Sequence, residues 1–591
     1  MGPVFHSFWV SRTTRQSIVS VLTQSRAAIA GLFLGALAPQ IAPADTSAGA
    51  YLAGRIALFN SDFDEAASYY AQALLRDPGN ATLMEHVVTA QLALGRIDAA
   101  LPVARRMEDM GLASQMANMV IIADMIGQGE FESLLGRASE EEGVSPLVDG
   151  LMLGWAQMGT GSVAKALDQF DTVAADNGLR GFAMYHKALA LASVGDFEGA
   201  EAIFADTSDG TAILSRRGAL AYAEVLSQLE RNGEAADMLR DAFGPGADPA
   251  VTDLIRRLDS GETLPYTHVR SARDGMAEIF FSIAVVLNGE TASDYAMIYA
   301  RMASYLRPDH IDALLLGAEL LDEVGQYDLA VEAYKQVPKG SPDYHAAELG
   351  RAEALRRAAK PDAAIEVLER LAVDYPDQAP VHSALGGLFR QQEDYTSAAA
   401  AYDRALELTP ESGRNRWFLL YARGICHERL GEWEDAEADF RTALELNPEQ
   451  PQVLNYLGYS LVEKQEKLDE ALDMIKRAVA SRPDSGYIVD SLGWVLYRLG
   501  RYDEAVGHME TAVELMPVDA VVNDHLGDVY WAVGRRLEAE FQWRRALSFI
   551  DPADTDGEAD PDRIRRKLEV GLDAVLSEEG APPIAFANDE G

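Results

Sequence analysis

The residue types that carry enzymatic chemistry are present in this chain, but not in the spacings that catalysis or metal binding requires. The sequence contains no H-E-x-x-H, no paired C-x-x-C, no nucleophile elbow and no phosphate-binding P-loop. Its ten histidines are scattered along the chain, so their spacing indicates no metal cluster. We therefore expect a protein that is not an enzyme and that uses no cofactor and no metal. A site assembled by folding from distant residues stays open as an alternative.

Two short segments resemble ligand-binding motifs. Gly159 to Lys165, GTGSVAK, looks like a phosphate-binding loop but lacks the Gly-Lys-Ser/Thr ending, and we interpret it as a turn between helices. Asp551 to Asp562, DPADTDGEADPD, carries six acids, and its Asp554-x-Asp556-Gly run resembles the beginning of a calcium loop. An EF-hand loop needs a glycine at its sixth position and a glutamate at its twelfth, and neither is present. We interpret this segment as a solvated acidic linker.

The overall charge limits the kind of partner. The chain has 93 acidic and 51 basic residues, a formal net charge of −42. This balance argues against nucleic acid and permits a basic partner whose contacts weaken in salt. A surface that merely prevents self-association is an equally good explanation. The single cysteine, Cys426, excludes an internal disulfide framework, and we expect it to be a small buried side chain.

The elements that must position any binding residue are helical hairpins. The 34 residues from Gly486 to Asp519 recur with drift along most of the sequence. Gly493 and Ala505 are small, which fits two helices in close approach, while Gly500 and Pro517 end the two helices. Four apolar residues recur at intervals of three and four and form a stripe: Leu492, Leu496, Met509 and Val513. One hairpin cannot cover its own stripe, so such units must stack.

These positions match the L-G-x2-Y, A-x3-F and terminal Pro pattern, and the chain thereby resembles the tetratricopeptide (TPR) repeat family. The resemblance implies an all-α fold, a TPR superhelical solenoid of about fourteen helical hairpins in two halves. Residues 244–276 begin with a run of helix breakers and could also be one more, eroded unit. The predicted organisation is an N-terminal TPR array of degenerate repeats at 45–243, an irregular joint at 244–276, a C-terminal TPR array at 277–551, an acidic linker and capping helix at 552–579, and a disordered tail at 580–591.

Residues 1–44 have the layout of a secretory signal peptide. Three arginines and no acid occur there, an apolar run extends from Ala27 to Ala38, and Ala42-Pro43-Ala44 forms an A-x-A cleavage site. The run of 12 residues is shorter than the about 20 that span a bilayer. We expect export to the periplasm with cleavage near Ala44, no lipidation at that site and no transmembrane helix in the mature chain. A cytoplasmic protein is the alternative.

The TPR resemblance also implies where a partner binds. In TPR proteins the first helix of each hairpin lines the concave groove, and we expect the last three repeats to bind a protein or peptide there. The predicted binding residues are Asn455, Tyr459, Tyr487, Asp490, Trp494, Tyr497, Arg498, Asp524, Asp528 and Trp531. Asn455, Asp490 and Asp524 share one repeat position, which fits hydrogen bonds to an extended peptide backbone. Bonds to neighbouring helices are the alternative.

Residues 454–547 further resemble the C-terminal repeats of the bacterial periplasmic TPR adaptor of carboxyl-terminal processing proteases. This run includes LNYLGYSLVEKQEKLDEALDMIKRAV and DSLGWVLYRLGRYDEAV. The resemblance implies a scaffold or adaptor in the cell envelope whose protein partner is such a protease or its clients. An envelope assembly factor for outer-membrane proteins or polysaccharide export is the alternative.

Overall fold

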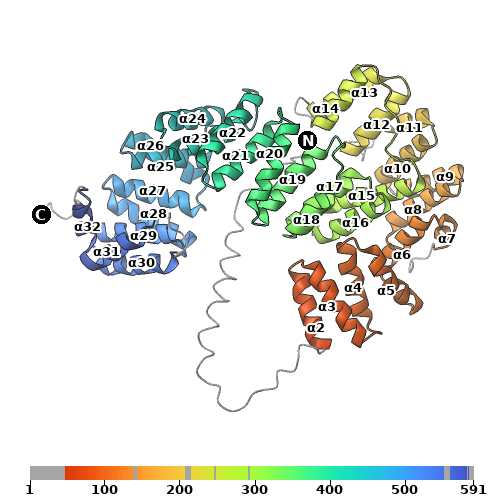
Figure 1. Cartoon of the computed structure of the whole chain (residues 1–591), viewed down its shortest axis with the longest axis horizontal. Coiled ribbons are helices and arrows are strands. Elements are labelled where there is room, and N and C mark those ends of the chain that lie inside the picture. Colours follow the sequence, from red (N-terminus) through yellow and green to blue (C-terminus); the bar gives the residue numbers. More distant parts are fainter. Residues whose placement is uncertain are drawn as a thin grey trace, which may run out of the picture. The chain divides into compact units, whose positions relative to one another are not determined.

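The computed structural model describes residues 47–137, 143–206, 215–244, 248–290, 293–550, 559–581 and 584 (Figure 1). These residues form α-helices joined by short turns, and no strand occurs among them. Within the same residues, every helix is too short or too polar to cross a membrane. The predicted signal peptide and most of the predicted acidic linker and tail lie outside the described residues. The chain divides into two compact units, Met1–Gln326 (unit 1) and Tyr327–Gly591 (unit 2).

The helices of unit 1 are α2 (Ser47–Phe59), α3 (Phe63–Arg76), α4 (Ala81–Ala93), α5 (Ile97–Asp109), α6 (Gln115–Gln128), α7 (Phe131–Gly136), α8 (Pro146–Gly159), α9 (Val163–Ala174), α10 (Arg180–Ser193), α11 (Phe197–Phe204), α12 (Arg216–Gln228), α13 (Asn232–Phe243), α14 (Pro249–Asp259), α15 (Ala272–Glu290), α16 (Ser293–Leu306) and α17 (Ile311–Glu323). The glycine-rich segment beginning at Gly159 is a turn between α8 and α9, as the sequence predicts.

The helices of unit 2 are α18 (Tyr327–Tyr334), α19 (Tyr344–Arg357), α20 (Pro361–Asp374), α21 (Ala379–Gln391), α22 (Tyr395–Leu408), α23 (Arg416–Arg429), α24 (Trp433–Leu446), α25 (Pro451–Glu463), α26 (Leu468–Ser481), α27 (Gly486–Arg498), α28 (Tyr502–Leu515), α29 (Ala520–Ala532), α30 (Arg536–Phe549), α31 (Pro561–Val570) and α32 (Leu572–Glu578). Cys426 is buried on α23, as expected, and burial raises the pKa of its thiol to about 11.

Several hairpins close on a glycine in their first helix. In α27, a Cβ added to Gly493 would lie 2.2 Å from the Met509 sulfur of α28. The turn between these two helices uses Gly500, whose φ of +73° permits the Gly500 and Arg501 amides to bond the carbonyls of Tyr497 and Leu496. The same close approach recurs in other hairpins: Gly154 on Phe170, Gly386 on Tyr402, Gly424 on Phe440 and Gly527 on Trp543. The repeated glycine is therefore a packing requirement, as predicted.

In unit 1 the hairpin α15–α16 packs against the first helices of earlier hairpins. Helix α15 contacts α8 and α10, and α16 contacts α4 and α6 (Figure 1). The side chain of Gln115 donates a 3.3 Å hydrogen bond to the Tyr299 hydroxyl, and a Cβ on Gly275 would lie 2.3 Å from the Trp155 ring. The face that these first helices share is thus covered by a segment of the same chain.

A buried carboxylate helps to fix this hairpin. Glu278 of α15 is 1% exposed and accepts hydrogen bonds from Arg217 at 2.8 Å and from the Tyr185 hydroxyl at 3.0 Å. His310 Nε2 lies 3.2 Å from the same carboxylate. Burial alone would raise the pKa of Glu278, but Arg217 and His310 hold that pKa well below its ordinary value. The ionised carboxylate therefore joins α15 to α10 and α12.

The segment predicted as a joint, residues 244–276, lies inside unit 1. Its helix α14 packs on α13, and the loop after it is anchored by Leu264 and Val269, which are buried. The boundary between the compact units lies after Gln326, at the end of the turn that joins α17 to α18.

The C-terminal cap is two helices where the sequence predicts one. Asp560 caps α31 as predicted, because its carboxylate accepts from the Asp562 and Arg563 amides. The helix then ends at Gly571, whose φ is +85° and whose added Cβ would lie 2.6 Å from the Trp531 ring. The bend brings Leu572 of α32, together with Ile564 of α31, into the hydrophobic core of unit 2. A single straight helix could not follow the surface of the last hairpin in this way.

Candidate protein-binding groove of unit 2

A cavity of about 1080 Å³ lies on the face formed by the first helices of the last repeats. Its walls come from α25, α27 and α29, with contributions from the end of α23 and from the C-terminal cap. Nine of the ten predicted binding residues line it, which are Asn455, Tyr459, Tyr487, Asp490, Trp494, Tyr497, Arg498, Asp524 and Asp528. We call this cavity the groove.

Trp531 is placed elsewhere. It is 8% exposed, and its indole nitrogen donates to an Asp573 carboxylate oxygen of the cap at 3.0 Å. Its ring packs on Trp543 with centroids 5.4 Å apart. The repeat position that faces the groove in α27 is thus covered by the cap in α29. Trp531 joins the last hairpin to the cap.

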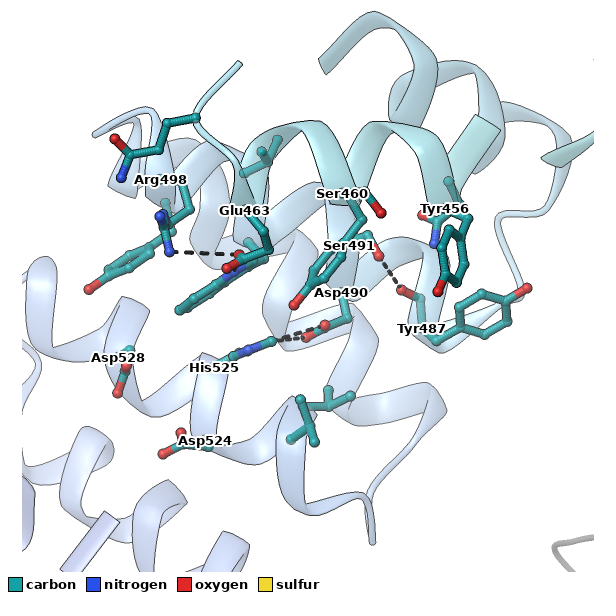
Figure 2. A pocket seen from close by; sticks show the side chains of 18 of the residues that line it. Tyr456, Ser460, Glu463, Tyr487, Asp490, Ser491, Arg498, Asp524, His525 and Asp528 are labelled. Carbon is teal, nitrogen blue, oxygen red and sulfur yellow. Dashed lines mark hydrogen bonds and ion pairs between the residues drawn. The ribbon is translucent and has the colours of Figure 1, made fainter. Parts of the chain in front are cut away.

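Aromatic rings form one wall of the groove. The Trp494 ring is stacked between two others, with centroids 3.9 Å from His525 and 4.9 Å from Tyr497. Its indole nitrogen donates to Glu463 at 2.9 Å. Tyr487, in contrast, is 47% exposed and is oriented away from the Asp490–His525 pair (Figure 2). Tyr487 is therefore a ring that an incoming chain can cover, while Trp494 is held in place.

Asp490 is bound by a histidine of the next repeat. Its two carboxylate oxygens lie 3.0 and 3.2 Å from His525 Nδ1 (Figure 2). Burial disfavours the charged imidazole, but the Asp490 carboxylate outweighs burial and raises the pKa of His525 above its ordinary value. This pair links α27 to α29, which is the bond between neighbouring helices that the sequence left open as the alternative.

Asp524 and Asp528 are bound by a lysine of the cap. Lys567 of α31 is 1% exposed, and its ammonium donates to Asp524 at 2.8 and 2.9 Å and to Asp528 at 2.6 Å. The Trp543 indole donates to the same Asp528 oxygen at 2.9 Å. Burial raises the pKa of Asp524, and the Lys567 charge opposes that rise. These carboxylates therefore fix the cap to the last hairpin.

Asn455 differs from the other two residues at its repeat position. Its side chain is buried, and its Oδ1 atom accepts no hydrogen bond from any described residue. Among the described residues that line the groove, no other buried side-chain atom lacks a partner. An unsatisfied buried acceptor costs about 1–3 kcal/mol, and a donor from a bound molecule would relieve that cost once the amide turned toward the groove.

Sequence reasoning missed several residues of the groove. His525, Tyr456 and Ser460 line it at repeat positions that the prediction did not include. Glu463 lines it at the last position of α25, which is equivalent to that of Arg498 in α27, but was not among the predicted residues. Lys567 was missed because it lies 43 residues after Asp524 in another element. One signal was available, since Ile564 and Lys567 are three residues apart and both buried on α31, and a lysine on an apolar stripe calls for a buried partner.

Comparison with known proteins identifies the family. The tetratricopeptide repeat model matches residues 51–114, 151–211, 315–379, 349–413, 421–486 and 461–520. These segments together cover more than half of the chain, which therefore belongs to the TPR repeat family and has the all-α solenoid fold of that family.

Similarity to individual proteins is local. A TPR repeat-containing protein of Pseudomonas aeruginosa is 29% identical over 173 residues, which are 29% of this chain and 28% of that protein. The lipoprotein NlpI homolog of Haemophilus influenzae is 39% identical over 94 residues, which are 15% of this chain and 29% of that protein. The crystal structure of the APC/C hetero-tetramer Cut9–Hcn1 aligns over 88% of this chain and 96% of that chain, with 15% identity and a TM-score of 0.37. The chain thus spans less than a third of the length of these two curated relatives.

Proposed function

We propose that this chain is a non-catalytic scaffold that binds an extended segment of a partner protein in the groove of unit 2. TPR repeats are protein-interaction elements, so the family match supports a protein partner. The observation that carries the more specific proposal is the buried, unpartnered Oδ1 of Asn455, in a groove that the exposed Tyr487 ring also lines. A peptide backbone supplies the missing donor as an N–H group, and Tyr487 supplies contact area.

Unit 1 is a weaker candidate for the same task. Its shared face of first helices is covered by α15 and α16, which contribute residues such as Phe280 and Met297 that are fully buried. A partner would have to displace a well-packed part of the same chain. The groove of unit 2 needs no such displacement, so we place the binding site there.

We further propose that the chain acts in the cell envelope after export. Two observations support this proposal: the signal-like sequence of residues 1–44, and the local similarity to a protein whose name describes it as a lipoprotein. A carboxyl-terminal processing protease or its client is the candidate partner, because residues 454–547 resemble the adaptor of such proteases. An envelope assembly factor is the second candidate, which the same two observations support.

Affinity capture with a matched variant tests the proposal. The full chain and its Asn455→Leu/Tyr487→Ala variant are each incubated with the same envelope extract, and bound proteins are quantified by mass spectrometry. We expect a carboxyl-terminal processing protease to be recovered at least about fivefold less by the variant, as the loss of hot-spot contacts predicts. Outer-membrane assembly or export components with the same dependence would favour the second candidate. Equal recovery by both baits would exclude the groove as the binding site.

Export is tested separately by N-terminal sequencing of the protein isolated from its native host. A first residue near Asp45 is expected, because cleavage after Ala44 removes the signal-like segment. An intact residue 1 would contradict export by cleavage and would leave the groove proposal unaffected.

A further inference from the structure

Two carboxylates of the groove, those of Glu463 and Glu428, have no cation within hydrogen-bond distance among the described residues. Glu463 accepts the Trp494 indole N–H at 2.9 Å, and the nearest Arg498 nitrogen is 3.6 Å away, beyond hydrogen-bond length (Figure 2). Glu428 accepts the Tyr456 hydroxyl at 3.4 Å, and Arg429 Nε is 3.8 Å away. The side chain of Glu463 is 41% exposed and that of Glu428 is 28% exposed. Both carboxylates therefore retain acceptor capacity that faces the groove.

Elsewhere in unit 2, the same combination of ring and carboxylate holds a cation at short distance. Arg535 donates to Glu510 at 2.8 Å while its guanidinium lies 4.0 Å from the centre of the Tyr530 ring. Lys567 bonds two carboxylates, and its ammonium lies 5.7 Å from the Trp543 ring. Carboxylates and aromatic faces both attract Lys and Arg. Glu428 and Glu463 each accept a bond from an aromatic side chain, but among the described residues no cation lies within hydrogen-bond distance of either carboxylate.

The charged residues that line the groove are mostly acidic. Seven carboxylates and three guanidinium groups line it, in a chain whose formal net charge is −42. The long-range field of such a chain favours a positively charged ligand and disfavours an acidic one.

We infer that the segment bound in the groove is an extended peptide bearing lysine or arginine. Its backbone N–H bonds Asn455 Oδ1, and its side-chain cation lies against Tyr456 or Tyr487 and pairs with Glu428 or Glu463. This inference rests on the proposed function, since it assigns the chemistry of the partner to the same site.

Selection from a displayed library of random twelve-residue peptides tests it. The full chain is the bait, and the Asn455→Leu/Tyr487→Ala variant is the matched control. We expect Lys and Arg to be enriched about threefold or more over Asp and Glu among peptides that bind the wild type and not the variant. Enriched peptides that are acidic or uncharged would contradict the proposal of a basic ligand but would still support the groove as the binding site. No enrichment on the wild type relative to the variant would overturn the groove itself.

A double-mutant cycle on one selected peptide then locates the cation. Glu463→Gln and Glu428→Gln are each tested against the peptide and against its Lys→Gln analogue. We expect at least one of the two variants to bind the lysine peptide more weakly, by up to about fivefold, as for a partly exposed ion pair. The affinity of the same variant for the Lys→Gln analogue should be unchanged. Asp484→Asn is the matched control, because Asp484 lies in a turn and its side chain is 77% exposed. This variant should change neither affinity. Equal losses for both peptides with both variants would contradict the pairing.

Discussion

The carboxylate of Asp490 and the imidazole of His525 join two consecutive hairpins through the floor of the groove, with Nδ1 3.0 Å from one oxygen and 3.2 Å from the other. The Trp494 ring stacks on the same imidazole at 3.9 Å between centroids. One histidine therefore contacts both an aromatic ring and a carboxylate that line the groove.

This pair predicts a pH dependence of stability. Because the pKa of His525 is raised in the folded chain, the native state binds a proton more tightly than the unfolded state. The stabilisation is fully present below the ordinary histidine pKa of about 6.5 and is lost as the pH rises through the higher folded value. Urea unfolding of wild type and His525→Gln across this range should show the difference shrinking as pH rises.

His508 of α28 provides the control for that measurement, because burial lowers its pKa. The stability difference between wild type and His508→Gln should therefore change in the opposite direction and grow as the pH rises. The same sign of slope for both variants would show that His525 is not held by Asp490 in solution.

Loss of the cap lysine should be costly. Lys567→Met leaves Asp524 and Asp528 buried without their cation, and breaking such a pair costs about 3–5 kcal/mol of unfolding free energy. Arg565→Met, on the same helix with a side chain 60% exposed, should cost less than about 1 kcal/mol. Denaturant unfolding of both variants checks the expectation. Similar losses would mean that the lysine does not hold the cap.

The glycines of two neighbouring helices should respond oppositely to alanine. A Cβ on Gly527 would lie 2.4 Å from the Trp543 ring, so Gly527→Ala should destabilise by about 1–3 kcal/mol. Gly507 of α28 has open space around its added Cβ, and Gly507→Ala should stabilise by up to about 1 kcal/mol through helix propensity. Thermal unfolding reports both signs, and a stabilising Gly527→Ala would refute the packing account.

The hairpin of unit 1 should loosen when its buried carboxylate is removed. Glu278→Gln takes away the charge that Arg217 and His310 face, which should cost about 3 kcal/mol or more and increase amide hydrogen exchange in α15. Asp237→Asn, whose side chain is 78% exposed, should change neither quantity. Unaltered exchange in α15 of the Glu278 variant would place the anchor of the hairpin elsewhere.

The sequence predicts the repeat unit well because that unit is local. Gly493, Gly500 and Ala505 have a short-range reason for their identity, and the same reason recurs in several other hairpins. Nine of the residues that line the groove could be predicted for the same reason, since they lie, as Asn455 and Tyr487 do, at repeat positions that face it.

The use of those residues depends on partners that the repeat pattern does not contain. Asp524 resembles Asn455 in position, yet Lys567 of a different element consumes it. The return of α15 and α16 onto α4 to α10 was also not predicted, because the hairpin has the same local pattern whether it continues a stack or folds back on one. Tertiary pairing between distant segments is the information that a periodic sequence hides.

The fold-back of α15 and α16 also has a mechanical consequence. A stack of hairpins joined only to its neighbours behaves as a soft spring, since each interface can tilt a little without breaking. The hairpin α15–α16 contacts four first helices and so connects hairpins that are not neighbours in the stack. A force that stretches unit 1 must therefore break buried contacts before these hairpins separate. Under tension, we expect unit 2 to lengthen elastically and unit 1 to be the stiffer of the two units.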